Sequence, residues 1–202
     1  MPILTADFYL NPDTPAVARS LLGKYLCTRI NGELTTGKIT ETEAYEAPHD
    51  KACHAYNNRR TSRTEIMFRA GGTAYVYLCY GIHHLFNVVT APAESARAVL
   101  IRGLEPVEGT DIMLQRRNIS VPQPRMTAGP GSLSQALGIS KEMTGQTLLD
   151  PDGQIWLEDR GTIIPPDDII ASPRVGIAYA EEWVEVPWRF RIKGNRYCSP
   201  AR

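Results

Sequence analysis

Polar and hydrophobic residues alternate along ITETEAY, residues 39–45, in the first quarter of the chain. Alternation with a period of two is typical of a β-strand, in which successive side chains point to opposite faces. The strand pattern begins further upstream, because KYLCTRI (24–30) and TGKITETEAY (36–45) flank the dipeptide Asn31-Gly32. An Asn-Gly dipeptide between two such runs is a strong signal for a tight turn. The sequence therefore predicts an antiparallel β-hairpin that carries two acidic residues on one face.

A second alternating stretch, TAYVYLCYGIHHLFNVV (73–89), predicts another hairpin. Its first arm alternates aliphatic residues with tyrosines, and Gly81 marks the turn because glycine readily adopts the left-handed backbone of tight turns. Tyr80 stands directly before that glycine. We therefore expect Tyr80 at the exposed tip of the hairpin.

Short helical patterns lie between and after the strands. Asp13 suits a helix N-cap, and the apolar positions that follow it end at Gly23. Two more helices are predicted over 109–117 and 131–139, and strands over 98–106, 154–160, 175–179 and 188–194. Strands and short helices without regular alternation favour an α+β fold over a doubly wound parallel one. We predict a single domain over residues 1–202, with a mostly antiparallel, curved β-sheet flanked by short helices.

The composition limits the class and the location of the protein. Hydrophobic residues make up 43% of the chain, and Lys+Arg and Asp+Glu both number 22. The total charge therefore favours neither nucleic acid nor an acidic partner. The first residues lack a basic segment followed by an apolar run, and no run of 18 apolar residues occurs. We expect a protein of the cytoplasm or the nucleus that is not secreted and has no membrane partner.

Glu41 and Glu43 allow two interpretations. Alternating acidic residues commonly form a solvated strand face, which would give them no chemical role. Neighbours on one strand face also lie about 6 to 7 Å apart, a separation that glycoside hydrolases use for a pair of catalytic carboxylates. Cleavage of a sugar bond, in a nucleoside or in a glycan, is therefore a candidate reaction.

Signals for metals and cofactors are weak. Cys79 and His83 have ligand-like spacing, but the two tight ligand pairs that are typical of structural zinc sites do not occur. The motifs GxGxxG, GxxxxGK[ST] and GxSxG do not occur either. The sequence predicts neither a metal nor a cofactor.

Aromatic and basic residues surround the acidic strand along the chain. Strand tyrosines usually belong to a core, but Tyr80 beside a turn glycine is better placed to push into a base stack. The segment NNRRTSRTEIMFRAGG (57–72) contains four arginines and one acid, and arginine suits phosphate contacts. Together these residues indicate chemistry on a nucleobase. The alternative from another class is a non-catalytic protein that binds damaged or single-stranded nucleic acid through aromatic and basic residues alone.

Several motifs, in the same order along the chain, resemble the alkyladenine (3-methyladenine) DNA glycosylase family. They are TETEAYEAPHDKACHA (40–55), RRTSRTEIMF (59–68), YVYLCYGIHHLFNV (75–88), VLIRGLEP (99–106) and AGPGSLSQALGI (128–139). The resemblance spans most of the chain. It implies an enzyme of base excision repair whose partner is double-stranded DNA containing damaged purines. We expect this enzyme to act as a monomer and to need no cofactor.

The resemblance also implies roles for residues at the matching positions. Glu43 resembles the general base that activates a water molecule, and Arg102 is similar to the arginine that helps to hold that water. The implied base pocket comprises Tyr45, His54, Tyr77 and Asn87; Tyr80 would fill the gap left in the duplex; and Arg59, Arg60 and Arg63 are candidates for contacts with the DNA backbone. With water as the nucleophile and no lysine assigned to the site, we predict a monofunctional enzyme that leaves an intact abasic site.

Overall fold

A long strand, β2 (Glu33–Glu46), runs through the centre of the sheet in the computed structural model, which describes residues 2–199. Its threonines, isoleucine and tyrosine favour extended backbone. Asn31 and Gly32 form the turn that leads into it, with positive φ angles of 54° and 83°. The strand before the turn, β1 (Tyr25–Ile30), pairs antiparallel with β2. The hairpin predicted from the Asn-Gly dipeptide is therefore confirmed.

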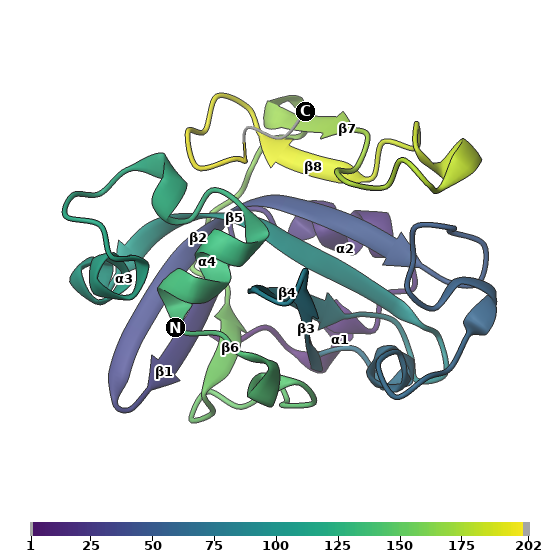
Figure 1. Cartoon of the computed structure of the whole chain (residues 1–202), viewed down its shortest axis with the longest axis horizontal. Helices are drawn as coiled ribbons and strands as arrows, with labels where there is room; N and C mark the ends of the chain where they lie inside the picture. The colour runs from purple at the N-terminus through teal and green to yellow at the C-terminus, as the bar shows by residue number, and fades with distance from the viewer. Residues whose placement is uncertain (1, 200–202) are drawn as a thin grey trace.

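The described residues form an eight-stranded sheet in the order β3-β4-β5-β2-β1-β6, with β8 paired to β2 and β7 paired to β8. All of these pairs are antiparallel. The remaining strands are β3 (Ala74–Cys79), β4 (His83–Val89), β5 (Arg97–Glu108), β6 (Ile155–Glu158), β7 (Ile169–Ser172) and β8 (Arg189–Ile192). Figure 1 shows β7 and β8 lying along β2 beyond the point where β1 has ended. The predicted α+β fold with a mostly antiparallel sheet is confirmed.

Short helices flank the sheet. They are α1 (Ala6–Tyr9), α2 (Thr14–Ser20), α3 (Thr110–Arg117) and α4 (Pro130–Leu137), with 3₁₀ turns at η1 (Tyr56–Asn58), η2 (Glu65–Phe68), η3 (Pro124–Met126), η4 (Lys141–Met143), η5 (Pro166–Asp168) and η6 (Glu181–Trp183). Asp13 caps α2 by accepting a hydrogen bond from the backbone N–H of Ala16 at 2.9 Å. The three helices expected after Asp13, over 109–117 and over 131–139 are all present.

The C-terminal third differs in part from the expected strands. The strands predicted over 154–160 and 188–194 correspond to β6 and β8, whereas the strand predicted over 175–179 is wrong. That segment is a loop, because Gly176 has a positive φ of 74° and the backbone N–H of Val175 donates to a side chain rather than to a neighbouring strand. Strand β7 and helix α1 have patterns too short to be predicted from the sequence.

Three apolar clusters hold these elements together, and the smallest of them lies around Ile177. The main cluster joins α2 and α4 to the sheet through residues such as Val17, Leu133 and Val99. A smaller cluster lies under the segment between β2 and β3, and Tyr45 and Tyr77 pack against it while staying partly exposed. The two tyrosines therefore lie at the rim of this core. Within residues 2–199, no helix is long and apolar enough to cross a membrane.

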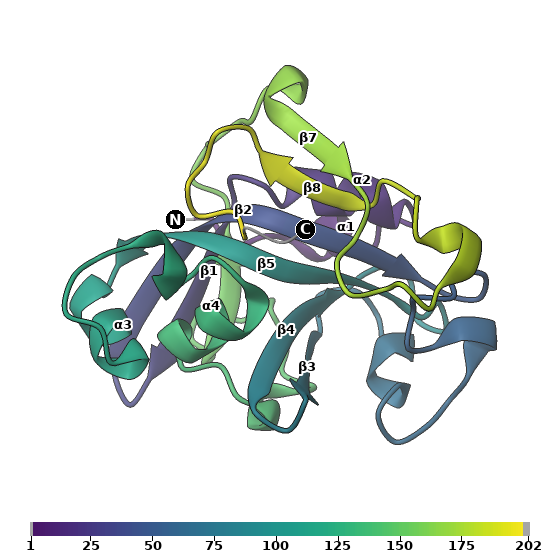
Figure 2. The same ribbon diagram turned by 45° about the horizontal axis from the view of Figure 1, so that its top comes forward.

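The hairpin of β3 and β4 projects from the end of the sheet, as Figure 2 shows. Gly81 forms its turn with a φ of 74°, and Tyr80 before it also has a positive φ, of 51°. The Tyr80 side chain is 92% exposed. This observation confirms the expected position of Tyr80 at an exposed tip.

Candidate active site

Glu41 and Glu43 lie in the part of β2 that has a neighbour on both edges. β5 pairs with one edge and β8 with the other. Neither glutamate has any solvent exposure. The interpretation of the two acids as a solvated strand face is therefore wrong, because Arg189 of β8, Ser199 and the backbone at Val175 pack against the two carboxylates. Two buried carboxylates require positive partners.

A β-bulge supplies the first of these partners. Glu41 lies opposite Gly103, whereas the next residue of β2, Thr42, lies opposite Ile101. Arg102 is thus an extra residue in β5, and a bulge redirects the side chain of the strand that contains it. The Arg102 guanidinium lies between the two acids, with Nε 2.9 Å from Oε1 of Glu41 and Nη1 3.3 Å from Oε2 of Glu43. Burial alone would lower the pKa of Arg102, but the two carboxylates outweigh it and raise that pKa.

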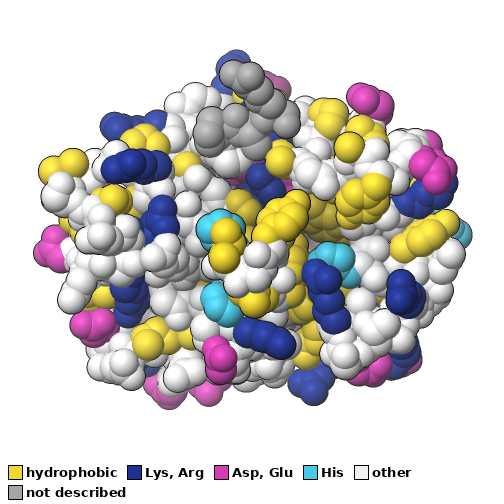
Figure 3. Space-filling model, viewed as in Figure 1, with side chains coloured by type: hydrophobic (Ala, Val, Ile, Leu, Met, Phe, Trp, Pro, Cys, Tyr) yellow, Lys and Arg dark blue, Asp and Glu magenta, His cyan; other side chains and the backbone are white. Residues whose placement is uncertain are grey.

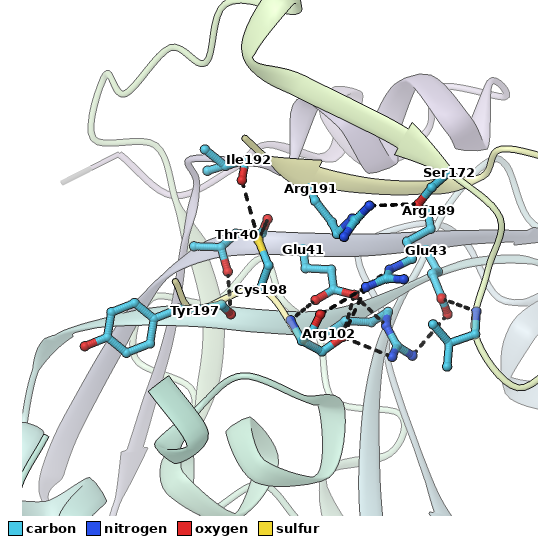
Figure 4. Close-up of polar contacts among 12 residues, drawn as sticks. Thr40, Glu41, Glu43, Arg102, Ser172, Arg189, Arg191, Ile192, Tyr197 and Cys198 are labelled. Atoms are coloured by element: carbon cyan, nitrogen blue, oxygen red, sulfur yellow. Dashed lines mark hydrogen bonds and ion pairs between the residues drawn. The ribbon is translucent and has the colours of Figure 1, made fainter. Parts of the chain in front are cut away.

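Glu41 is saturated with hydrogen-bond donors. Its Oε1 accepts from Nε of Arg102, from Nε of Arg189 at 2.7 Å and from the hydroxyl of Ser199 at 2.8 Å, and its Oε2 accepts from the backbone N–H of Ser199. Figure 4 shows the two arginines converging on this carboxylate. Glu41 therefore orients Arg102, and its carboxylate accepts four hydrogen bonds from the protein and has no solvent exposure. A pair of acids that share the work of glycoside cleavage does not fit this geometry.

Burial by itself would raise the pKa of Glu41, but the charge of Arg102, the hydrogen bonds from Ser199 and the charge of Arg189 hold it below its usual range. As the pH falls through about 4.3, the ordinary pKa of a glutamate, Glu41 takes up a proton in the unfolded chain before it does so in the folded protein. We therefore expect the free energy of unfolding to fall as the pH is lowered through that range. In urea titrations from pH 7 to pH 3, Glu41→Gln should be less stable at pH 7 and lose less stability on acidification. An exposed control, Glu185→Gln, should follow the wild type; equal acid dependence in all three proteins would contradict the expectation.

Glu43 has different partners from Glu41. Its Oε2 accepts from the hydroxyl of Tyr45 at 2.8 Å, and its Oε1 accepts from the backbone N–H of Val175 at 2.8 Å. Tyr45, Arg102 and Val175 all line a single cavity of about 500 Å³. The Glu43 carboxylate therefore lies directly behind the wall of a cavity whose size is typical of small-molecule sites.

The cavity wall contains the aromatic residues singled out from the sequence. Tyr45, His54, Tyr77 and Asn87 all line it, as do Tyr80 and Arg102. The rings of His54 and Tyr77 meet edge to face, with centroids 4.7 Å apart and an interplanar angle of 83°. Figure 3 shows hydrophobic side chains around a hollow near the middle of one face, with histidine and Lys or Arg side chains beside it.

Comparison with known proteins identifies the family of the chain. The sequence pattern of the methylpurine-DNA glycosylase (MPG) family matches residues 7–196 of the chain. The chain belongs to the methylpurine-DNA glycosylase family.

Bacterial relatives support this membership over nearly their whole length. A protein of Chlamydia felis is 47% identical over 194 residues, which is 94% of this chain and 96% of its own. Relatives from Natranaerobius thermophilus and Bacillus cereus are 44% and 46% identical, and they cover 95% and 93% of this chain and 96% and 94% of their own. All three are provisionally named 3-methyladenine DNA glycosylases.

Two neighbours in the cavity wall fix the tautomer of His54. Nη2 of Arg63 lies 3.1 Å from Nε2 of His54, and a guanidinium can only donate, so Nε2 must be the acceptor. Nδ1 then carries the hydrogen and donates to the hydroxyl of Tyr75 at 2.9 Å. Burial, with the charge of Arg63, lowers the pKa of His54 to about 4. The ring is therefore neutral at pH 7 and presents a lone pair held in place by Tyr75, a tyrosine for which the sequence suggested no specific role.

Asn87 is also held in one orientation. Its Nδ2 donates to the backbone carbonyls of Tyr75 and Leu85, at 3.2 Å and 3.3 Å, and the residue is 4% exposed. Both hydrogens of the amide are thus used by the hairpin backbone. The side chain therefore forms a rigid part of the cavity wall.

The three arginines predicted to contact DNA have different surroundings. Arg60 pairs with Glu65 at 3.0 Å and with Glu94, and it covers the ring of Phe68. Arg63 turns toward the cavity. Within the described chain, Arg59 makes no ion pair. Their contacts with a DNA backbone remain predictions, and Arg59 is the one whose charge is least engaged by the protein.

Sequence reasoning missed a buried pair that supports the pocket from behind. Arg174 donates to both oxygens of Asp50, at 2.6 Å and 2.8 Å, and to the backbone carbonyl of Ala44 at 2.8 Å. Its guanidinium also lies 4.7 Å from the ring centroid of Tyr45. Asp50 and Arg174 are 124 positions apart, so no local pattern connects them. In residues 2–199, no group of three or more His, Cys, Asp or Glu side chains is arranged to hold a metal ion.

Proposed function

We propose that this chain extrudes alkylated or deaminated purines from duplex DNA and hydrolyses their N-glycosidic bond, leaving an abasic site. The observation that carries this proposal is the buried Glu43 carboxylate behind the wall of an aromatic cavity of about 500 Å³, with Arg102 fixed beside it. The site is complete within one chain, which supports action as a monomer. We expect it to act on DNA inside the cell, without a cofactor.

In the proposed reaction, Glu43 takes a proton from a water molecule in the cavity as the water oxygen bonds to C1′ of the sugar. The bond between C1′ and the purine nitrogen breaks, and its electron pair leaves with the base. The sugar passes through an oxocarbenium-like state, which an ionised carboxylate stabilises. Arg102 keeps its charge because it lies between two carboxylates. It orients the water and limits the repulsion between the two acids.

The extruded base would lie between aromatic rings of the pocket. Stacking of a base on an aromatic side chain contributes about 1 to 3 kcal/mol. N-alkylation gives the purine a positive charge, which the electron-rich faces of Tyr45 and Tyr77 attract. Asn87, with its amide fixed, would exclude bases that present an extra exocyclic group at its position.

Water is the nucleophile that the site supports. Among the described residues that line the cavity none is a lysine, so an amine that could form a Schiff base is not at hand. Lys51, which lies within one of the glycosylase motifs, instead pairs with Glu181 and Glu182 at 2.6 Å and 2.9 Å. We therefore infer a monofunctional enzyme without lyase activity.

The test is single-turnover release of the free base from a duplex that contains one hypoxanthine or ethenoadenine, or from methylated DNA. The abasic sites are developed with alkali in one half of each sample and left untreated in the other. Release of the base, with strand breaks only after alkali, is the expected result. Strand breaks without alkali would reject the monofunctional mechanism, and no release from any substrate would reject the glycosylase.

Tyr80 provides a test of base extrusion. With 92% of its side chain exposed, it contributes little to the core, so Tyr80→Ala should fold normally. We expect about a tenfold or larger loss of base release from duplex DNA, because extrusion costs a few kcal/mol and the vacated stack would no longer be filled. Release from single-stranded DNA should change much less. Exposed Ile163→Ala is a matched control on another surface; equal losses on both substrates would instead favour a hydrolase that acts on nucleosides without extrusion.

A further inference from the structure

Arg63 is an exposed residue whose guanidinium turns back onto the base pocket. Its Nη2 lies 3.1 Å from Nε2 of His54, and its Cζ lies 4.7 Å from the ring centroid of Tyr77. Both partners line the cavity, and Arg63 lines it with them. The guanidinium thus contacts the π face of Tyr77 and the lone pair of His54, which are the two kinds of group that the pocket offers to a ligand.

No acidic residue accounts for this position. Within residues 2–199, no carboxylate lies within ion-pair distance of Arg63, whereas its neighbour Arg60 is held by Glu65 and Glu94. The pocket itself therefore attracts the Arg63 side chain. A guanidinium on a tyrosine face gains about 0.5 to 2 kcal/mol, depending on its exposure.

The backbone that carries Arg63 is fixed, so the side chain is the part that can move. Thr61 and Thr64 bond each other through their hydroxyls and backbone N–H groups, and the Thr64 hydroxyl donates to the carbonyl of Arg59 at 2.7 Å. Thr64 is only 3% exposed. Release of the pocket therefore requires rotation of one exposed side chain and no movement of the loop.

The guanidinium shares its recognition features with a damaged purine. It is planar, it is positively charged, and it donates an N–H group. A purine alkylated at a ring nitrogen has all three features when its exocyclic amino group is intact. Undamaged adenine is planar and has the N–H donor, but it lacks the charge.

We propose that Arg63 is an internal occupant of the base pocket, and that an extruded purine enters by displacing its guanidinium from Tyr77 and His54. This inference rests on the proposed function of the pocket. Every base must compete with Arg63, so a base that forms only weak contacts leaves the guanidinium in place. Arg63 thereby raises the contact energy that a base needs in order to enter the pocket. Undamaged purines lack the positive charge, so they meet this requirement least well. Once displaced, the side chain is free for the phosphate contact predicted from the sequence.

The experiment uses nucleosides that lack phosphate, so that a phosphate contact of Arg63 cannot influence the result. Binding of 1-methyladenosine, a cation at neutral pH, and of adenosine, its neutral match, is measured by titration of the full-length protein. Arg63→Met keeps an unbranched side chain without the charge. We expect it to bind 1-methyladenosine about tenfold more tightly than the wild type, as for a pocket that is about 90% occupied by the guanidinium. Arg29→Met is the matched control, because Arg29 lies over the ring of Trp156 outside the cavity, and it should bind as the wild type does.

NMR of the His54 ring gives an independent measurement. In the wild type without ligand, Nδ1 should carry the hydrogen, and 1-methyladenosine should shift the His54 signals. In Arg63→Met the ligand-free signals should already differ, because the donor to Nε2 has been removed. Unchanged nucleoside affinity in Arg63→Met would overturn the inference, and unchanged His54 signals would show that Arg63 does not contact the ring.

The two proposals fail in different ways. If the wild type releases bases from damaged duplexes but Arg63→Met does not bind nucleosides more tightly, the glycosylase stands and the internal occupant is rejected. If affinity rises in Arg63→Met but no duplex releases a base, the occupant stands and the enzymatic proposal is rejected. The free energy of unfolding in urea is measured for both arginine variants, and values equal to that of the wild type show that neither change alters the fold.

Discussion

Glu43→Gln is expected to reduce base release from damaged duplex DNA by about 10²- to 10⁴-fold, the range in which a general base contributes to catalysis. The amide has the size of the carboxylate, so the pocket keeps its shape. It cannot take a proton from water, and it carries no charge to stabilise the developing positive sugar. Arg102 keeps its pairing with Glu41 at 2.9 Å, so the variant should remain folded.

The measurement is single-turnover release at saturating enzyme, with duplex affinity determined in parallel. Glu46→Gln, the same substitution on the same strand, is the matched control, because Glu46 pairs with Arg97 away from the cavity. Duplex binding should persist in both variants. If Glu43→Gln released bases at the wild-type rate, Glu43 would not be the base. Binding without release by the wild type itself would support a damage-binding protein instead.

Arg174→Leu is expected to lower the free energy of unfolding by about 3 to 5 kcal/mol, because removing one partner of a buried ion pair leaves the other charge uncompensated. Neither side chain of the pair with Asp50 has any solvent exposure. The carbonyl of Ala44 would lose its donor as well. Base release should also fall, because the guanidinium no longer supports the ring of Tyr45 from behind.

Urea unfolding at neutral pH measures this loss of stability. A double variant isolates the interaction energy between Asp50 and Arg174 from the contacts that each residue makes with its surroundings. Asp50→Leu combined with Arg174→Leu should be less destabilised than the sum of the two single variants, since no unpaired charge remains. Lys51→Met, which breaks ion pairs with the largely exposed Glu181 and Glu182, should lower the free energy of unfolding much less than Arg174→Leu does, because water screens exposed ion pairs. A loss below about 1 kcal/mol in Arg174→Leu would show that the buried pair is not a main support of the pocket.

The correct predictions from sequence concern features that depend on a few adjacent residues. The Asn-Gly turn, the exposed Tyr80 and the helix capped by Asp13 were all predictable, because each follows from the backbone preference or the hydrogen bonds of neighbouring positions. The motifs of the family also lie in short stretches, which is why the resemblance to DNA glycosylases was visible in the sequence. The β-bulge was not, since it depends on how β2 and β5 pair.

Tertiary structure alone decided what the two acids of β2 do. Alternation places Glu41 and Glu43 on one face, but it cannot tell a solvated face from a buried one. Strand β8 covers the second edge of β2 and brings Arg189 to Glu41, 148 positions away. Arg102 then divides the pair into a saturated Glu41 and a Glu43 beside the cavity. The sequence determined which residues could take part in a reaction. Pairing between distant strands determined which of the two carboxylates lies beside the cavity, because burial and charge neutralisation arise only when those strands meet.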